Sequence, residues 1–254
     1  MVLALEGAHR GNTIFVIGSG PGLGSYSADI LEKVGRRVCI GVNRTQYLVK
    51  LTYFMSSYLS ENLLAKVVDP QVYAIHTRPV LEPPMVSGIN TIKRVYSEDS
   101  SLFRSNFDPT NPCLYTRDNV IFLATNMALI MGAKNIVYVG CEQRNGLHFY
   151  NTNDEILNRI IIDMCKVITE YGPNLGRDHS YEFPLRIMRS LTTNAETLRS
   201  SPFYTIDHSK LLREWLDRLA LEFAVKVYSC SQDSVITDAG AEFIELEQAL
   251  DTLG

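Results

Sequence analysis

The feature that most constrains the fold is an apolar run, Ile14-Phe15-Val16-Ile17, that leads directly into the turn Gly18-Ser19-Gly20-Pro21-Gly22. A strand that enters a glycine turn and then a helix is typical of nucleotide-binding α/β proteins. Backbone N–H groups in such a turn can approach a phosphate, and the helix dipole favours its negative charge. The turn therefore predicts a phosphate-bearing ligand, with Gly18, Ser19, Gly20 and Pro21 as binding residues.

The common dinucleotide interpretation of this turn fits poorly. The fingerprint for NAD needs a glycine at its sixth position and an acidic residue at the end of the next strand. Here the sixth position is Leu23, and the next strand-like run ends in the uncharged Asn43. An NAD-dependent oxidoreductase is therefore disfavoured.

Strand-like and helical segments alternate along the 254 residues, which predicts an α/β fold with a doubly wound, mostly parallel, Rossmann-like sheet in a single domain, residues 1–254. Gly132 is a natural stop for the helix that precedes the strand expected at Asn135–Gly140. Strands are expected at Thr13–Gly18, Arg37–Val42, Tyr53–Ser56, Val72–His76, Asn135–Gly140, Phe203–Ile206 and Lys226–Cys230. Helices are expected at Leu23–Val34, Ser60–Val67, Asn119–Met131, Glu155–Glu170 and Ser209–Phe223.

Two stretches do not show this alternation of strands and helices. Residues 98–118 contain Pro109 and Pro112 with several Asn and Asp, which predicts an irregular loop. Residues 171–202 are longer and also without clear periodicity. A long aperiodic segment after the fifth strand predicts a lid-like insertion near the carboxyl edge of the sheet.

Composition excludes several classes of protein. A net charge of −4 argues against a nucleic-acid-binding surface. The five cysteines are scattered without metal-ligand spacing, which predicts buried free thiols in a reducing compartment. Residues 1–13 lack the apolar stretch of a signal peptide, and the apolar run from Val120 to Ala133 is too short to span a bilayer. We expect a cytoplasmic protein, and peripheral contact with a membrane stays open.

A histidine stands at a strand-to-helix junction late in the chain. His208 follows the expected strand Phe203–Ile206 and precedes the helix that starts at Ser209. Catalytic groups gather at such junctions on the carboxyl edge of a parallel sheet. The ordinary pKa of histidine suits a general base near neutral pH. His208 is therefore a candidate catalytic base.

Three segments, in this order, resemble the small bacterial sialyltransferases of glycosyltransferase family 42. The first is the strand and turn Val16–Pro21, and the second is the helix–strand block Ala128–Gly140. The third is Tyr204-Thr205-Ile206-Asp207-His208-Ser209-Lys210, followed after a helix by Lys226–Ser231. Asn43 matches the nucleotide-contacting asparagine of that family. Each motif alone is weak, and their order and spacing make the set moderately specific.

This resemblance implies an inverting transfer of sialic acid from CMP-sialic acid to a sugar hydroxyl, without a metal or another cofactor. His208 would act as general base, while the glycine turn, Asn43 and Ser57 would hold the cytidine monophosphate. Arg117 stands where the family has an arginine before the helix at 119–131. The absence of an Asp-x-Asp motif in the chain agrees with metal-independent transfer. Family members assemble into tetramers, so a homo-oligomer stays open here.

The chain departs from the family where the leaving phosphate is bound. The family uses two tyrosines there, but this chain has Arg144 at the first position and Phe149 at the second, with His148 and Tyr150 beside it. A cation can stabilise a departing phosphate electrostatically. We therefore expect Arg144 and Tyr150 to be catalytic and His148 to bind substrate.

Two further positions differ from the family. Glu142 stands where the family has an aspartate and is a candidate substrate-binding residue. Val120-Ile121 replaces a serine-glycine pair, so the family's donor contacts at that point cannot be carried over.

Two other functions compete with sugar transfer. The hydroxymethylpterin diphosphokinase-like proteins share the Gly-x-Gly-Pro turn and the helix–strand block, which would imply diphosphoryl transfer to a pterin-like alcohol. That reaction should need magnesium and several carboxylates, and the sequence offers clearly only Glu142. The replaced tyrosine and serine-glycine positions are also compatible with a nucleotide-binding relative that has lost catalysis.

Overall fold

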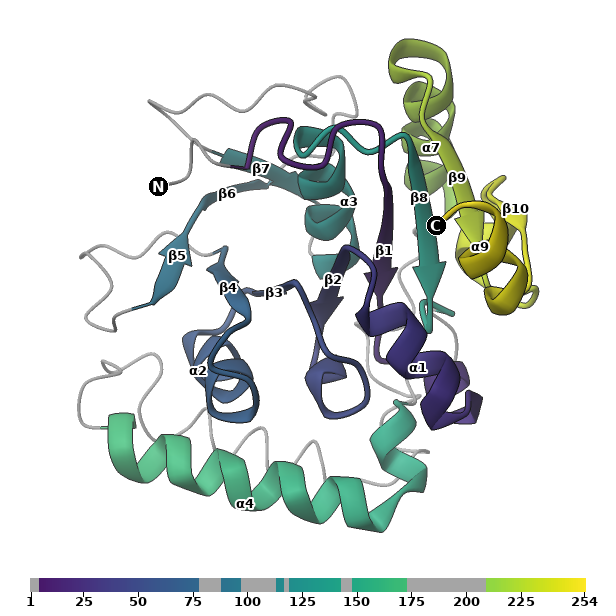
Figure 1. Cartoon of the computed structure of the whole chain (residues 1–254). Helices are drawn as coiled ribbons and strands as arrows, with labels where there is room; N and C mark the ends of the chain where they lie inside the picture. Colours follow the sequence, from purple (N-terminus) through teal and green to yellow (C-terminus); the bar gives the residue numbers. More distant parts are fainter. Residues whose placement is uncertain (1–4, 78–87, 97–112, 117–118, 143–147, 173–208) are drawn as a thin grey trace.

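The computed structural model describes residues 5–77, 88–96, 113–116, 119–142, 148–172 and 209–254. Eight strands form one sheet in the order β10-β9-β8-β1-β2-β3-β4-β5 (Figure 1), and every pairing in it is parallel. This arrangement confirms the predicted Rossmann-like α/β fold. The strands are β1 (Thr13–Ile17), β2 (Cys39–Val42), β3 (Tyr53–Ser56), β4 (Tyr73–His76), β5 (Ile89–Thr91), β8 (Asn135–Val139), β9 (Lys226–Ser229) and β10 (Glu242–Phe243).

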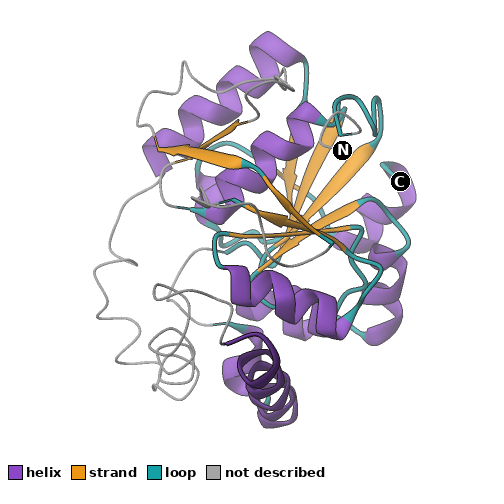
Figure 2. Cartoon of the chain, turned by 90° about the vertical axis from the view of Figure 1, so that its left-hand side faces the viewer, coloured by secondary structure: helices purple, strands orange, loops and turns teal. Residues whose placement is uncertain are grey.

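Helices cover both faces of this sheet (Figure 2). One face packs against α1 (Ala28–Gly35), α2 (Leu59–Val68) and α9 (Leu246–Thr252), and α4 (Asp154–Tyr171) lies against α2. The other face packs against α3 (Val120–Ile130), α7 (Ser209–Phe223) and α8 (Val235–Asp238). Burial on both faces explains why the central strands read as continuous apolar runs.

The buried helix α3 accounts for the most apolar stretch of the sequence. Nearly all of its residues are buried, including Thr125 and Asn126, so it lies within the core. Gly132 follows its last turn with φ +85°, the left-handed conformation that glycine adopts at helix ends, and the helix stops where the sequence predicted. In the described part of the chain, no helix combines the length and apolarity needed to cross a membrane.

The region predicted as an irregular loop contains a strand, so that prediction is wrong in part. β7 (Cys113–Thr116) pairs in parallel with β6 (Lys93–Tyr96) to form a separate two-stranded sheet. Both strands are four residues long, too short to give a recognisable alternation. The remainder of 98–118 lies outside the described residues, as do residues 173–202 of the predicted lid and the strand expected at Phe203–Ile206.

The first helix begins later than the sequence predicted. The glycine turn continues into a short 3-10 helix, η2 (Pro21–Ser25), and α1 starts only at Ala28. Ser27 caps α1, because its hydroxyl accepts a hydrogen bond from the N–H of Ile30. This gap between η2 and α1 matters for ligand binding, because the glycine turn leads into one short 3-10 turn and not into the N-terminus of a long helix with its dipole.

The prediction of buried free thiols holds for three of the four cysteines whose side chains the structure describes. Cys39, Cys141 and Cys230 are buried and unpaired. Cys165 is also unpaired, but it is exposed on α4 because the outer face of this amphipathic helix points to solvent.

Candidate functional site

The order in which the strands follow one another reverses between β1 and β8, which are neighbours in the sheet. From β1 the order runs through β2 to β5 on one side, and through β8 to β10 on the other. The loops that leave two such neighbouring strands diverge and open a crevice at their carboxyl ends, where α/β proteins bind ligands. The glycine turn leaves β1 and Glu142 follows β8, so both lie at this switch point.

The glycine turn packs directly against the Glu142 side chain. A Cβ atom on Gly20 or Gly22 would collide with the Glu142 carboxylate in its present position, and one on Gly20 would also come within 2.8 Å of the Gly140 carbonyl oxygen. The N–H groups of Gly18 and Gly20 donate to the carbonyls of Val139 and Gly140, each at 2.8 Å. These two donors are therefore used to join the turn to the end of β8.

The Glu142 carboxylate is only half satisfied. Its Oε1 accepts a hydrogen bond from the Ser231 hydroxyl at 2.8 Å. Its Oε2 is buried and has no hydrogen-bond partner among the described residues. A buried carboxylate oxygen without a donor is costly and fits a ligand hydroxyl or amino group better than a phosphate.

Ser19 joins the turn to the 3-10 helix η5 (Phe149–Thr152). Its hydroxyl oxygen lies 2.8 Å from Nδ1 of His148, and its carbonyl accepts a hydrogen bond from the N–H of Phe149 at 3.0 Å. Burial, together with the positive charge of Arg44, lowers the pKa of His148 to about 4. The imidazole is therefore neutral at pH 7, and its Nδ1 can accept the proton of the Ser19 hydroxyl.

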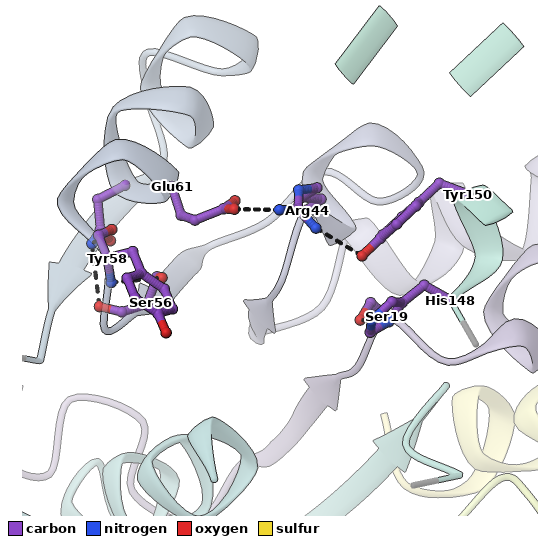
Figure 3. A network of polar contacts seen from close by, with 8 residues as sticks. Ser19, Arg44, Ser56, Tyr58, Glu61, His148 and Tyr150 are labelled. Carbon is purple, nitrogen blue, oxygen red and sulfur yellow. Dashed lines mark hydrogen bonds and ion pairs between the residues drawn. The ribbon is translucent and has the colours of Figure 1, made fainter. Parts of the chain in front are cut away.

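A buried ion pair continues the network from η5 to α2 (Figure 3). Arg44 follows β2, and its Nη2 donates to Oε1 of Glu61 on α2 at 2.6 Å. Its Nη1 donates to the Tyr150 hydroxyl at 2.7 Å. Arg44, Glu61 and Tyr150 are only 8%, 4% and 2% exposed. Burial alone would lower the pKa of Arg44, but the adjacent Glu61 carboxylate raises it, so the arginine stays charged.

Tyr150 is fixed on several sides. The His148 ring stacks on its ring with centroids 4.9 Å apart and an interplanar angle of 19°. The Phe149 ring meets it edge-on at 5.2 Å, and the Arg44 guanidinium lies 5.2 Å from its centroid. The predicted residues Ser19, His148 and Tyr150 thus form one connected group.

Asn43 and Arg44 have an unusual backbone. Their φ angles are +52° and +69°, in the left-handed region. Asparagine tolerates this conformation, whereas for arginine it costs about 1–2 kcal/mol. In this conformation the Arg44 side chain makes its contacts with Glu61 and Tyr150.

Of the remaining predicted residues, two lie in the described part of the chain and three lie outside it. Ser57 follows β3 on the same edge of the sheet, where its hydroxyl lies 3.0 Å from that of Thr77, and Pro21 opens η2. Arg117, Arg144 and His208 lie outside the described residues, although α7 begins directly after His208. Within the described ranges, no cluster of three or more His, Cys, Asp or Glu side chains could hold a metal ion.

Sequence reasoning missed three residues of the site: Arg44, Glu61 and Ser231. Arg44 stands directly after the predicted Asn43, and Ser231 directly after the predicted last strand. Their position at strand ends was the available signal, because side chains there converge on the carboxyl edge. Glu61 lies inside a predicted helix and carried no such signal.

The fold and this edge define a Rossmann-like α/β protein with a polar crevice at the switch point of its sheet. No protein-family model and no curated protein matches the chain. Among solved structures, the sialyltransferase CST-II in complex with CMP is similar, with a TM-score of 0.47 and 14% sequence identity. The alignment covers 92% of this chain and 88% of that chain.

Proposed function

We propose that this protein is a glycosyltransferase that uses a nucleotide-sugar donor, and that the reaction is transfer of sialic acid from CMP-sialic acid to a sugar hydroxyl. The observation that carries the proposal is the meeting of the glycine turn, Glu142 and His148–Tyr150 at the switch point. These segments are far apart in the sequence, and one of them, the glycine turn, belongs to the segments that carry the resemblance to family 42.

The site offers different chemistry to the two halves of a nucleotide. The unpartnered Oε2 of Glu142 suits a hydroxyl or amino group of the nucleoside, since a carboxylate repels a phosphate. On the other side of Ser19, the Tyr150 hydroxyl would face the phosphate together with Arg144. Asn43, at the end of β2, would contact the nucleotide between them.

In the proposed reaction, His208 takes the proton from the acceptor hydroxyl. The acceptor oxygen then forms a bond to the anomeric carbon of the sugar, while the bond from that carbon to the phosphate oxygen breaks. The leaving group is CMP, whose growing negative charge Tyr150 and Arg144 stabilise. Attack opposite the leaving group inverts the anomeric centre.

The test is incubation with CMP-sialic acid and lactose, with chromatography of the products. We expect sialyl-lactose and CMP from the wild type, and at least a ~100-fold lower rate from His208→Ala. His9→Gln is the matched control, because His9 binds Tyr53 at the opposite edge of the sheet. Full activity of His208→Ala, or no transfer from any of a panel of nucleotide sugars, would contradict the proposal.

A thermal-shift panel separates the competing functions. Ligands that bind the folded state raise its melting temperature. We expect stabilisation by CMP over UDP, GDP and NAD. Stabilisation by CMP without turnover of any donor would indicate an inactive nucleotide-binding protein. Magnesium-dependent consumption of ATP with a hydroxymethylpterin would indicate the diphosphokinase.

A further inference from the structure

Within the proposed function, we propose that Arg44 is a positioning residue, which sets the direction in which the Tyr150 hydroxyl donates its proton. A guanidinium has only donors, so the Tyr150 oxygen must be the acceptor in its 2.7 Å bond with Arg44. The phenolic proton is thereby turned away from Arg44. A departing phosphate oxygen is an acceptor of the kind that such a proton would meet.

The geometry requires an arginine rather than any cation. Two different nitrogens of one planar group reach Glu61 and Tyr150, at 2.6 Å and 2.7 Å. A lysine ammonium on its flexible stem can keep the ion pair but lacks this fixed fork. The backbone of Arg44 is left-handed, with φ +69°, while its side chain makes these two contacts.

Charge explains why Arg44 acts through Tyr150 rather than on a phosphate itself. Arg44 is 8% exposed, and its guanidinium is already paired with the Glu61 carboxylate. The pair is neutral as a whole, so it attracts an anion weakly. Its effect on the reaction is therefore orientation of the phenol, which His148 supports by stacking on the same ring.

Two variants test this role. Arg44→Lys should keep the ion pair and the melting temperature but lower kcat for sialyl transfer by about 10- to 100-fold, with the donor KM little changed. Tyr150→Phe should lower kcat similarly, and adding Arg44→Lys to it should cost less than about twofold more. Arg36→Lys, in the exposed pair with Glu32, is the matched control.

Two outcomes would overturn the role: wild-type kcat in Arg44→Lys, or an equal loss from Arg44→Lys with and without Tyr150→Phe. If the Arg44→Lys variant does not fold, the double variant Arg44→Gln with Glu61→Gln is tested instead. It has no charge at either position, and the same loss of kcat is expected.

A spectroscopic measurement separates this inference from the proposed function. With tyrosine labelled by ¹³C at Cζ, the Tyr150 signal is assigned as the one missing in Tyr150→Phe. We expect this signal to move in Arg44→Lys and to stay in Arg36→Lys. An unmoved signal in Arg44→Lys overturns the inference. Absence of transfer by the wild type overturns the proposed function, and the NMR signal still decides whether Arg44 orients the phenol.

Discussion

The Ser19 hydroxyl oxygen and Nδ1 of His148 lie 2.8 Å apart, although 129 positions separate the two residues in the sequence. This contact joins the turn after β1 to the loop after β8, across the switch point of the sheet. A neutral imidazole can accept the Ser19 proton at Nδ1, whereas a protonated one would donate from Nδ1 to the hydroxyl oxygen and would carry a charge that burial disfavours. The crevice is therefore held together by a group whose charge depends on pH.

Stability should rise with pH over the range in which His148 titrates. The pKa of His148 is about 4 in the folded protein, against 6.5 for an ordinary histidine. Between these values the unfolded chain binds more protons, so the free energy of unfolding falls as the pH drops from 6.5 towards 4. The expected loss is on the order of 1–3 kcal/mol, and it is absent above pH 6.5.

Thermal melts between pH 5 and 7.5 would measure this effect. His148→Asn keeps an acceptor for Ser19 but does not titrate, so its melting temperature should depend less on pH. His9, whose pKa burial also lowers, remains in both proteins and accounts for part of the slope that persists. Equal slopes for the two proteins would contradict the assignment to His148.

The close contact between Gly22 and Glu142 predicts a paired rescue. A methyl group at position 22 would meet the Glu142 carboxylate, and the next nearest atom is the Ser231 hydroxyl oxygen at 3.9 Å. Because the carboxylate can move aside only by giving up its hydrogen bond with Ser231, Gly22→Ala should cost about 1 kcal/mol of folding free energy. Adding Glu142→Ala should return most of it, because the obstructing side chain is gone.

Urea unfolding of both variants would check the rescue. Gly172→Ala is the control, since Gly172 has helical dihedral angles and its Cβ would meet, among the described residues, only Ile168, at 3.8 Å. If the double variant is no more stable than Gly22→Ala, the contact with Glu142 is not the reason why position 22 is a glycine.

The sheet could be predicted because its signals are local. Each central strand is an apolar run between turn residues, and alternation with helices fixes a parallel arrangement. The order of the strands, and with it the switch point, does not follow from that alternation, and the strands β5 and β10 were not predicted. The β6–β7 pair could not be predicted, because strands this short owe their existence to each other.

The site could be predicted in its parts but not in its connections. Ser19, His148 and Tyr150 each stand beside a strand end or in a loop, where sequence indicates ligand contacts. Their contact with one another depends on tertiary packing. Glu61 reads as an ordinary helix-surface charge, and its burial against Arg44 has no local signal.

The buried pair of Arg44 and Glu61 should respond very differently to the loss of one partner and of both. Glu61→Leu leaves a buried guanidinium without its counter-charge, which should cost about 3–5 kcal/mol. Arg44→Met combined with Glu61→Leu should recover much of this loss, because no charge remains buried. Chemical unfolding gives both values.

An exposed pair provides the comparison. Glu32→Ala breaks the ion pair with Arg36, whose side chains are 66% and 72% exposed, and should cost about 0.5 kcal/mol or less. A cost for Glu61→Leu as small as that for Glu32→Ala would mean that water reaches Arg44.

Asn43 offers a way to separate a backbone role from a ligand role. Its φ of +52° is one that glycine adopts without strain, so Asn43→Gly should change the free energy of unfolding by about 0.5 kcal/mol or less. The same variant removes the carboxamide proposed to contact the nucleotide, and CMP affinity should fall about tenfold, the value of one hydrogen bond. Asn43→Ala should lose affinity and stability together, because alanine is strained at this φ. Thermal melts and calorimetric titration with CMP measure the two effects. Unchanged CMP affinity in Asn43→Gly would mean that asparagine stands there only for its tolerance of the left-handed turn.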